Sequence, residues 1–436
     1  MRIQRDQYLR ELIRHRDNGR VKIITGIRRC GKSYLLSEIY RDYLLSDGVH
    51  GEQIVELALD EIGNVRYRNP FELDAFIRKR IAETDQRYYI FIDEVQFCEE
   101  IPNPYLGDSG QKVTFIDTLL GLMKIPNVDL YVTGSNSRML SKDVLTQFRD
   151  RGDEIHLHPL SYAEFREACP DKAHAWRDYC VFGGMPYVLQ LETPEEKSRY
   201  LKQLFEETYL RDIVERNGIR NDQEVLDVLL DFVSSAIGSL TNPSKLENRF
   251  RSEKKMAVTH TTISRYLEYF REAYVIDCAR RYGIRGAAYF DTPLKYYFGD
   301  IGLRNARLNF RQTEETHIME NIIYNELIRR GFNVDVGIVS YSGKTADEGG
   351  KERKVRLQLE VDFVAGKGQQ RYYIQSALHL DDPAKREQEI NSLKRIGDSF
   401  RKMVIVKDDI LPWRDEKGIV YMGIEQFLLD ESAIDL

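Results

Sequence analysis

The stretch Val21-Lys-Ile-Ile-Thr-Gly-Ile-Arg-Arg-Cys-Gly-Lys-Ser33 decides how the first part of this chain folds. Its first five residues form an apolar run typical of a buried strand, and residues 32–45 have the apolar spacing of a helix. Between them, Gly26 to Ser33 have the spacing GxxxxGK[ST]. Two glycines let the backbone curl, so that consecutive N–H groups converge at the start of the helix. The stretch therefore predicts a strand, a tight loop and a helix, with the loop able to hold phosphate groups.

The residues of this loop predict a site for a nucleoside triphosphate. Lys32 adds a full positive charge opposite the β- and γ-phosphates, and the Ser33 hydroxyl is placed to hold Mg²⁺. The alternative is a chance glycine-rich turn, but the strand before the loop and the helix after it supply the context that the motif requires. We therefore predict ATP and Mg²⁺ as cofactors. The predicted nucleotide-binding residues are Gly26, Ile27, Arg28, Arg29, Cys30, Gly31, Lys32, Ser33 and Tyr34.

A second apolar strand, Tyr88-Tyr-Ile-Phe-Ile-Asp-Glu94, ends in two acidic residues. We predict that Asp93 joins Ser33 in holding Mg²⁺ and that Glu94 polarises the attacking water. An acid pair at a strand end is otherwise an ordinary solvated loop. Beside the glycine loop it favours hydrolysis of the nucleotide over binding alone.

Two further segments contribute candidate catalytic residues. Asp129-Leu-Tyr-Val-Thr-Gly134 runs into Ser135-Asn-Ser137, where Ser135 or Asn136 would bond the γ-phosphate or the water; a helix N-cap is the alternative. Phe148-Arg-Asp-Arg-Gly152 places Arg149 and Arg151 before another strand. Such an arginine can reach a transition-state phosphate in its own or a neighbouring subunit, and a surface salt bridge is the plainer reading. The predicted catalytic residues are Lys32, Glu94, Asn136 and Arg151.

Apolar runs and helical patterns alternate through the first part of the chain and predict an α/β fold with a parallel sheet. The predicted strands are 21–25, 53–59, 88–93, 128–133 and 154–158, and the predicted helices between them are 32–45, 70–83 and 113–124. A mostly helical lid or connector follows at 161–220, broken at Phe182-Gly-Gly-Met-Pro186. The predicted domains are 1–160, 161–220, 221–310 and 311–436.

The third predicted domain has the element order of a winged helix-turn-helix. Its predicted elements are helices at 224–237, 243–251 and 261–273 and strands at 275–281 and 294–298. Residues 243–285 contain ten Lys or Arg and five acidic residues, although the chain has a net charge of −6. The helix beginning near Thr259-His-Thr-Thr-Ile-Ser264 would then enter the major groove of double-stranded DNA. A lid or a protein contact is the alternative use of the same domain.

The last predicted domain is α/β and resembles a PD-(D/E)xK nuclease core. Glu320 and Glu326 fall on a predicted helix at 314–331, and Asp362 falls on a strand at 357–364. A working core also needs a carboxylate and a lysine on the next strand, so that Mg²⁺ is held and water activated. Those places hold Gln375-Ser-Ala377, so we predict an inactive nuclease fold. Glu360, on the same strand face as Asp362, is the one candidate substitute.

Several segments together resemble a known family. They are Gly26-Ile-Arg-Arg-Cys-Gly-Lys-Ser33, Phe91-Ile-Asp-Glu-Val-Gln96, Thr133-Gly-Ser-Asn136, Leu157-His-Pro-Leu-Ser161 with Glu164-Phe165, Gly183-Gly-Met-Pro186 and Tyr209-Leu-Arg-Asp212. They resemble the prokaryotic AAA-type P-loop ATPases that carry a winged helix and a C-terminal restriction-endonuclease-like domain, akin to the archaeal STAND-type ATPases. The resemblance implies a P-loop NTPase (AAA-like) fold and Arg151, rather than Arg149, as the arginine before the fifth strand. It leaves the biological role open.

Composition narrows the class of protein. Of 436 residues, 42% are hydrophobic, which excludes a disordered chain, and 64 basic against 70 acidic residues exclude a protein that coats polyanions. Five scattered cysteines without a CxxC pair fit a reducing compartment. A charged N-terminus and no long apolar run predict a cytoplasmic protein without a membrane contact.

The predicted function is a nucleotide-driven switch or remodeller that hydrolyses ATP. Its predicted partners are ATP, double-stranded DNA through the winged helix and a protein partner, with a homo-oligomer left open. Two alternatives stay open: a DNA-directed ATPase with residual Mg²⁺-dependent nuclease activity, and a nucleotide-regulated scaffold that does not hydrolyse.

Overall fold

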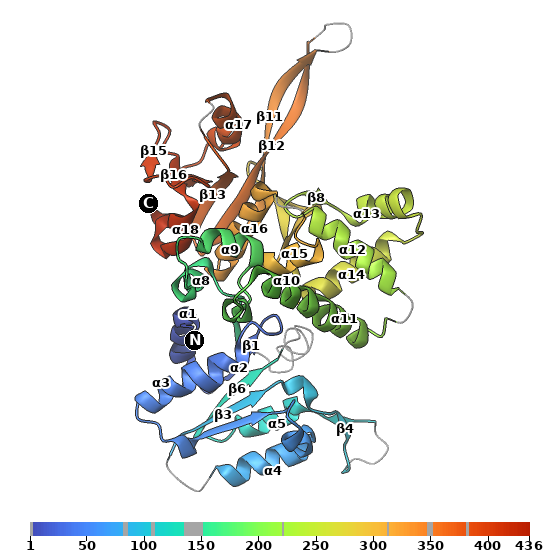
Figure 1. The fold of residues 1–436 in the computed structure, drawn as a ribbon, viewed down its shortest axis with the longest axis vertical. Helices are drawn as coiled ribbons and strands as arrows, with labels where there is room; N and C mark the ends of the chain where they lie inside the picture. Colours follow the sequence, from blue (N-terminus) through green and yellow to red (C-terminus); the bar gives the residue numbers. More distant parts are fainter. Residues whose placement is uncertain are drawn as a thin grey trace. The chain divides into compact units, whose positions relative to one another are not determined.

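The chain divides into two compact units (Figure 1). The computed structural model describes residues 3–81, 86–105, 110–134, 151–219, 222–311, 314–346, 352–380 and 383–436. The N-terminal unit consists of Met1–Pro159 with Glu272–Tyr274, and the C-terminal unit consists of Leu160–Arg271 and Val275–Leu436.

A five-stranded parallel sheet forms the centre of the N-terminal unit, as predicted. Its strands, in the spatial order β2-β3-β6-β1-β7, are β2 (Ile54–Ala58), β3 (Tyr88–Asp93), β6 (Val128–Thr133), β1 (Val21–Thr25) and β7 (Gly152–His156). Every residue of β1 and β6 is buried, which a central strand covered on both faces requires. Strand β7 begins two residues earlier than predicted, because its ladder with β1 starts at the pair Val21 and Gly152.

Helices cover this sheet. They are α1 (Asp6–His15), α2 (Lys32–Tyr34) continuing through the π-helix Leu35–Tyr40 into α3 (Arg41–Ser46), α4 (Pro70–Arg80) and α5 (Phe115–Leu122). Asn69 caps α4 ahead of Pro70, and Thr114 with Asp117 forms a capping box at α5. Apolar side chains of α4 and α5 pack with Ile23, Ile90 and other strand residues in one core. The helices thus hold the strand ends in fixed positions.

The C-terminal unit is built on a nine-stranded mixed sheet with the order β15-β16-β14-β13-β12-β11-β9-β10-β8. The strands are β8 (Leu240–Thr241), β9 (Ile276–Gly283), β10 (Ala288–Phe298), β11 (Asn333–Ala346), β12 (Glu352–Lys367), β13 (Gln370–Ala377), β14 (Arg401–Val406), β15 (Trp413–Arg414) and β16 (Val420–Gly423). Strands β9 and β10 are the pair predicted for the winged helix, and β9 runs parallel to β11. The pair therefore belongs to the same sheet as the strands of the last predicted domain.

The helices of this unit include the predicted ones and two that were not predicted, at residues 301–307 and 424–429. Residues 161–219 form α8 (Tyr162–Ala168), α9 (Ala175–Phe182), α10 (Pro194–Gln203) and α11 (Arg211–Arg216). The middle helices are α12 (Gln223–Ser235), α13 (Pro243–Arg249) and α14 (His260–Glu272), and the later ones are α15 (Ile301–Arg307), α16 (Glu315–Arg329), α17 (Pro383–Lys394) and α18 (Ile424–Leu429). No helix in the described ranges is long and apolar enough to cross a membrane.

The polar stretch 342–354 is paired over more of its length than its composition predicts. Its Gly and charged residues predict a hairpin loop, and β11 and β12 do form a hairpin there, but they continue to pair as far as Ala346 opposite Glu352 (Figure 1). Main-chain hydrogen bonds carry an antiparallel ladder whether or not its side chains are apolar, so polarity alone does not end a strand. Residues 347–351 lie outside the described ranges.

At Gly183 and Gly184, where a break between helices is predicted, the backbone packs closely against Asp300. Gly183 has φ 70°, and a Cβ there would lie 2.3 Å from Asp300 Oδ1. The Gly184 N–H donates to Asp300 Oδ2 at 2.6 Å, and the Leu303 N–H donates to Asp300 Oδ1 at 3.0 Å. Burial raises the pKa of Asp300 to about 6. The glycines thus let α9 approach the capped start of α15 closely.

Candidate functional site

The glycine loop leaves the carboxyl end of β1 in a curled conformation. Gly26, Arg29 and Gly31 all have positive φ, at 140°, 65° and 102°. A Cβ at Gly26 would lie 2.2 Å from the carbonyl oxygen of Leu157, so this position accepts only glycine without a shift of the backbone. Gly31 caps α2 in the left-handed conformation. The loop is therefore wound back toward the first residue of the helix.

Lys32 is held in the middle of this curl. It is the first residue of α2 and 4% exposed, and its Nζ donates to the carbonyl oxygens of Gly26 at 3.1 Å and Ile27 at 3.2 Å. The ammonium group thus sits inside the loop, where a bound phosphate would meet both it and the positive end of the helix. Ser33 follows it and is exposed.

The other predicted loop residues line the same turn with different exposures. Ile27 and Cys30 are buried, Arg28 and Tyr34 are half-buried, and Arg29 is exposed. Burial raises the pKa of the Cys30 thiol, which donates to the Leu157 carbonyl at 3.4 Å. Cys30 is thus a packing residue that supports the loop, while the arginines and Tyr34 are accessible beside it.

Asp93 and Glu94 lie at the end of β3 and share one partner, Thr133 at the end of β6. The Thr133 hydroxyl donates to the Asp93 carboxylate, and the Glu94 N–H donates to the Thr133 hydroxyl oxygen at 3.1 Å. Glu94 has φ 53°, a conformation that non-glycine residues adopt rarely and that is concentrated at functional sites. The Gln96 side-chain amide donates to the Glu94 carboxylate. These contacts fix both acids at one edge of the sheet.

The acid pair and the glycine loop lie at the same edge of the sheet, where its parallel strands end. Strands β1, β6 and β3 are adjacent and parallel, so their carboxyl ends lie together. Neighbouring strands are about 4.8 Å apart, so the loop after β1 and the acids after β3 are separated by about 10 Å. That distance suits a phosphate chain with a hydrated cation. Thr133, between them, was not among the predicted site residues; the signal for it is a polar residue ending an apolar strand.

His156 ends β7 on the other side of β1. Its Nδ1 lies 2.9 Å from the Thr25 hydroxyl oxygen. Burial, and then the charge of Lys32, lower the pKa of His156 to about 4, so the imidazole is neutral near neutral pH. The ring of His158 packs against it at 4.5 Å. His156 therefore supports the strand end without adding a charge.

Among the predicted catalytic residues that the structure describes, Arg151 lies away from this edge. Arg151 is exposed and precedes β7, and its carbonyl oxygen accepts from the N–H of Val21, the first residue of β1. Five strand residues span about 16 Å, so Arg151 lies at the opposite edge of the sheet from the loop. Asn136 and the alternative arginine, Arg149, lie outside the described residues.

The predicted DNA-reading helix presents a polar surface. Thr259 caps α14 through the Thr262 N–H, and Ser264 and Arg265 on α14 are exposed. Tyr266 faces inward, where its hydroxyl donates to Asp222 at 2.5 Å. Among the basic residues of 243–285, Arg249, Arg251 and Arg271 form ion pairs with acids one helical turn away, while Lys254, Lys255 and Arg265 are exposed.

The acids of the last domain fall into two groups. Glu320, Glu360 and Asp362 gather around Lys295, whose Nζ lies 2.8, 2.7 and 3.7 Å from them. Glu326 is elsewhere on α16 and pairs with Arg329 and Arg330, each at 2.6 Å. Sequence reasoning missed Lys295. Its signal is one lysine inside the apolar run Leu294-Lys-Tyr-Tyr-Phe298, which is predicted as a strand.

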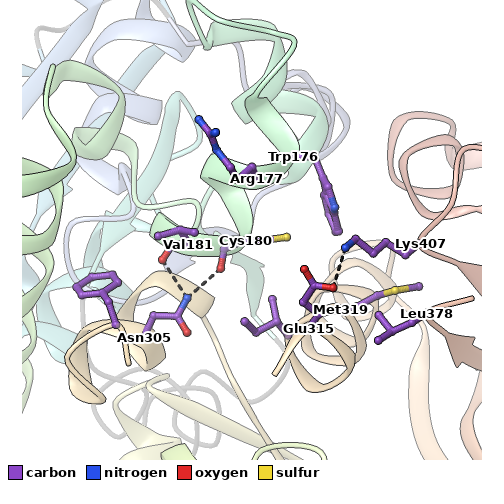
Figure 2. Close-up of a pocket in the computed structure, with 11 residues that line it drawn as sticks. Trp176, Arg177, Cys180, Val181, Asn305, Glu315, Met319, Leu378 and Lys407 are labelled. Atoms are coloured by element: carbon purple, nitrogen blue, oxygen red, sulfur yellow. Dashed lines mark hydrogen bonds and ion pairs between the residues drawn. The ribbon is translucent and has the colours of Figure 1, made fainter. Parts of the chain in front are cut away.

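The C-terminal unit also encloses a cavity of about 300 Å³ (Figure 2). It is lined by Trp176, Arg177, Cys180, Val181, Asn305, Phe310, Glu315, Ile318, Met319, Leu378 and Lys407. Lys407 Nζ lies 2.7 Å from Glu315 Oε2, and the Asn305 amide donates to the carbonyl oxygens of Cys180 and Val181 (Figure 2). Because these polar groups are paired with other protein groups, the surface that lines the cavity is mainly apolar.

Comparisons with known proteins cover both units. Residues 18–166 match the family model described as "AAA domain", and residues 173–314 match a domain of unknown function (DUF8612). The chain is 31% identical over 412 residues to an uncharacterized protein of Haemophilus influenzae, covering 92% of this chain and 93% of that protein. It is 26% identical over 432 residues to an uncharacterized protein of Methanocaldococcus jannaschii, covering 95% of this chain and 85% of that protein.

A solved structure of the Aeropyrum pernix ORC1 protein in complex with DNA is also similar, at 12% identity. The alignment covers 70% of this chain and 92% of that chain, with a TM-score of 0.29. A TM-score of this size carries no weight for the fold of the whole chain.

Proposed function

Because the chain belongs to the same protein family as its Haemophilus influenzae relative and matches the AAA domain over residues 18–166, we propose that it is an ATPase that works as a nucleotide-driven switch or remodeller. The parallel sheet and the AAA match together bear out a P-loop NTPase fold for the N-terminal unit. The single observation that carries the proposal is that the glycine loop and the acid pair open on the same sheet edge, separated by β6.

The residues at this edge fit a nucleotide and a magnesium ion. Mg²⁺ prefers oxygen ligands, and the Ser33 hydroxyl and the Asp93 carboxylate supply them. When bound, the ion neutralises charge on the phosphate oxygens. Lys32 exchanges its bonds to the Gly26 and Ile27 carbonyls for phosphate oxygens, and the curled backbone directs its N–H groups at the same anion.

Glu94 is proposed to orient and polarise the attacking water. Its backbone is fixed by Thr133 and its carboxylate by Gln96, so the acid is held in one orientation next to Asp93. A carboxylate within hydrogen-bond reach of the water is the usual activating group in this reaction class. Asn136 is proposed to bond the γ-phosphate or the water.

Arg151 is proposed to act on the nucleotide of a neighbouring copy. Its place at the far edge of the sheet leaves the loop of its own chain about 16 Å away, beyond the reach of one side chain. An arginine supplied by a second subunit is an established way to stabilise phosphoryl transfer. We therefore propose a homo-oligomer as the active form.

The test measures phosphate release from ATP by the full chain with Mg²⁺, for the unmodified protein and for two variants. Arg151→Ala removes the proposed arginine and Glu94→Gln removes the water-activating group. A co-expressed mixture is expected to turn over ATP faster than either variant alone, because a chain with Glu94 then meets a neighbour with Arg151. A mixture no faster than its components would contradict action between chains. An unmodified protein without turnover would contradict the ATPase itself.

A second proposal concerns the middle of the chain, residues 221–310, as a winged helix that binds double-stranded DNA. It is favoured by the exposed polar start of α14, with Arg265 on its outer face and Lys254 and Lys255 just before it. Exposed side chains of this kind contact phosphates while the helix lies in the major groove. Residues 161–220 would then connect this module to the ATPase core at 1–160. Residues 311–436 are proposed as an inactive nuclease-like domain.

DNA affinity is expected to fall steeply with salt. If Lys254, Lys255 and Arg265 contact three phosphates, the slope of log K against log salt concentration is about −2.7. Replacing all three with Ala should bring the slope close to zero, whereas Lys79→Ala, which removes an exposed charge from α4, should leave it unchanged. Fluorescence anisotropy with a labelled duplex at several salt concentrations measures this. Binding by the unmodified protein that does not vary with salt would count against the proposal.

A further inference from the structure

Three carboxylates of the C-terminal unit surround one ammonium group. Lys295 Nζ on β10 lies 2.8 Å from Glu320 Oε1, 2.7 Å from Glu360 Oε1 and 3.7 Å from Asp362 Oδ1. The acids come from α16 and β12, so the lysine joins three elements. Its side chain is 4% exposed, and those of Glu320 and Asp362 are 7% and 12% exposed. Glu360 is 34% exposed, so the charges of Lys295, Glu320 and Asp362 are screened less by solvent than the charge of Glu360.

A divalent cation bound by all three acids would have to share their carboxylates with Lys295, which contacts one oxygen of each. Mg²⁺ binds oxygen at about 2.0–2.1 Å in a near-octahedral arrangement, and the ammonium group occupies the position between the carboxylates that such an ion would take. Burial disfavours the charged lysine, but Glu320, Asp362 and Glu360 raise the pKa of Lys295 above its ordinary value overall. Because Lys295 Nζ lies within 3.7 Å of all three carboxylates, the lysine competes with a metal ion from within the same chain.

The remaining groups of this cluster are also engaged. Glu320 Oε1 accepts from the Tyr297 hydroxyl at 2.7 Å, and Asp362 Oδ2 accepts from the Ser376 N–H at 2.9 Å. Burial, followed by the charge of Glu320, raises the pKa of Asp362, and the Lys295 ammonium opposes that shift. In the part of the chain that the structure describes, no group of three or more His, Cys, Asp or Glu residues is arranged to hold a metal ion.

On the next strand, neither predicted position supplies a charge. Gln375 Oε1 lies 3.4 Å from the N–H of Asp362 and accepts from it. Ala377 packs with Tyr373 in the apolar cluster beneath α17. The Mg²⁺ that a nuclease core requires therefore does not fit the residues present, even though three acids are close together.

We propose that the Lys295 ammonium takes the place of a divalent cation among Glu320, Glu360 and Asp362, so that the C-terminal unit is closed to Mg²⁺ and removing the lysine opens a divalent-cation site. The proposal concerns the C-terminal unit alone and does not depend on the ATPase. It follows that the unmodified chain does not cleave DNA in a metal-dependent manner.

The test is a titration of the full, nucleotide-free chain with Mn²⁺, followed by electron paramagnetic resonance. Lys295→Met keeps the length of the side chain and removes its charge, and Lys295→Ala leaves more room for a hydrated ion. Both variants are expected to bind one Mn²⁺ per chain more than the unmodified protein. The added site should be lost when Asp362→Asn is combined with either variant.

Thermal unfolding with and without Mn²⁺ gives a second readout. Removing Lys295 leaves three acids without their cation, so both variants should unfold at lower temperature, and Mn²⁺ should restore part of the loss. Lys22→Met is the matched control, because Lys22 is also buried but forms its ion pair with Asp129. Mn²⁺ should not restore the stability of that control.

Two results would overturn the proposal. One is Mn²⁺ bound by the unmodified, nucleotide-free protein at a site that Asp362→Asn abolishes. Lys295 and a metal ion would then occupy the cluster together, and the lysine would not replace the ion. The other is a pair of Lys295 variants that gain no Mn²⁺ site or do not fold even with Mn²⁺ present, which would make the cluster a structural ion network only.

Discussion

Replacing Glu94 with Gln is expected to slow ATP turnover by about 10²- to 10⁴-fold while ATP still binds. The amide has the shape of the carboxylate and can stay beside Gln96, but it cannot polarise or accept a proton from water. The Glu94 N–H bond to Thr133 does not involve the side chain, so the backbone at the end of β3 should be retained. The nucleotide-binding residues on the glycine loop are unchanged in this variant. We therefore expect the affinity for ATP to be retained while turnover falls.

Steady-state phosphate release and calorimetric ATP binding, measured on the same preparation, check this expectation. Glu99→Gln is the matched control, since it makes the same chemical change at an exposed acid five residues along the chain. That control should behave as the unmodified protein. Equal loss of binding and turnover in Glu94→Gln would mean that Glu94 holds the site together instead of activating water, and unchanged turnover would remove it from the reaction.

Replacing Lys32 with Ala is expected to weaken ATP binding by about 100-fold or more, since each hydrogen bond to a charged group contributes about 1.5–3 kcal/mol. Lys32 is buried inside the curl of the loop, so no neighbouring side chain can take over its position. Turnover should fall with binding. In contrast to Glu94→Gln, the Lys32→Ala variant should therefore lose both ATP binding and ATP turnover.

Binding of ATP by isothermal titration calorimetry, together with thermal unfolding, measures this effect. Lys79→Ala removes the same charge from an exposed position on α4 and should leave ATP affinity unchanged. The unfolding curve matters because Lys32 also bonds the Gly26 and Ile27 carbonyls, and a folded variant is needed to assign the loss to the nucleotide. A folded Lys32→Ala protein with unchanged affinity would contradict the proposed site.

Local pattern was enough to predict much of the N-terminal unit. Strands β1, β3 and β6 have the bounds that were predicted, because each is an apolar run of five or six residues ended by a glycine or an acid. The glycine loop was predicted for a similar reason: its backbone curl depends on residues within eight positions of one another. Asp93 and Glu94 were predicted as site residues because they come at the end of such a run.

The sequence was therefore enough to predict which segments form strands and helices and which residues lie at their ends. The tertiary structure decided which of those ends meet. It put Thr133 between the loop and the acids, put Arg151 at the opposite edge of the sheet, joined β9 to β11 in one sheet, and brought Lys295 to three acids from other elements. The physical reason is that a strand or helix is encoded by periodicity over a few residues, whereas strand order and buried ion pairs join residues far apart in the chain, and no local pattern records that pairing.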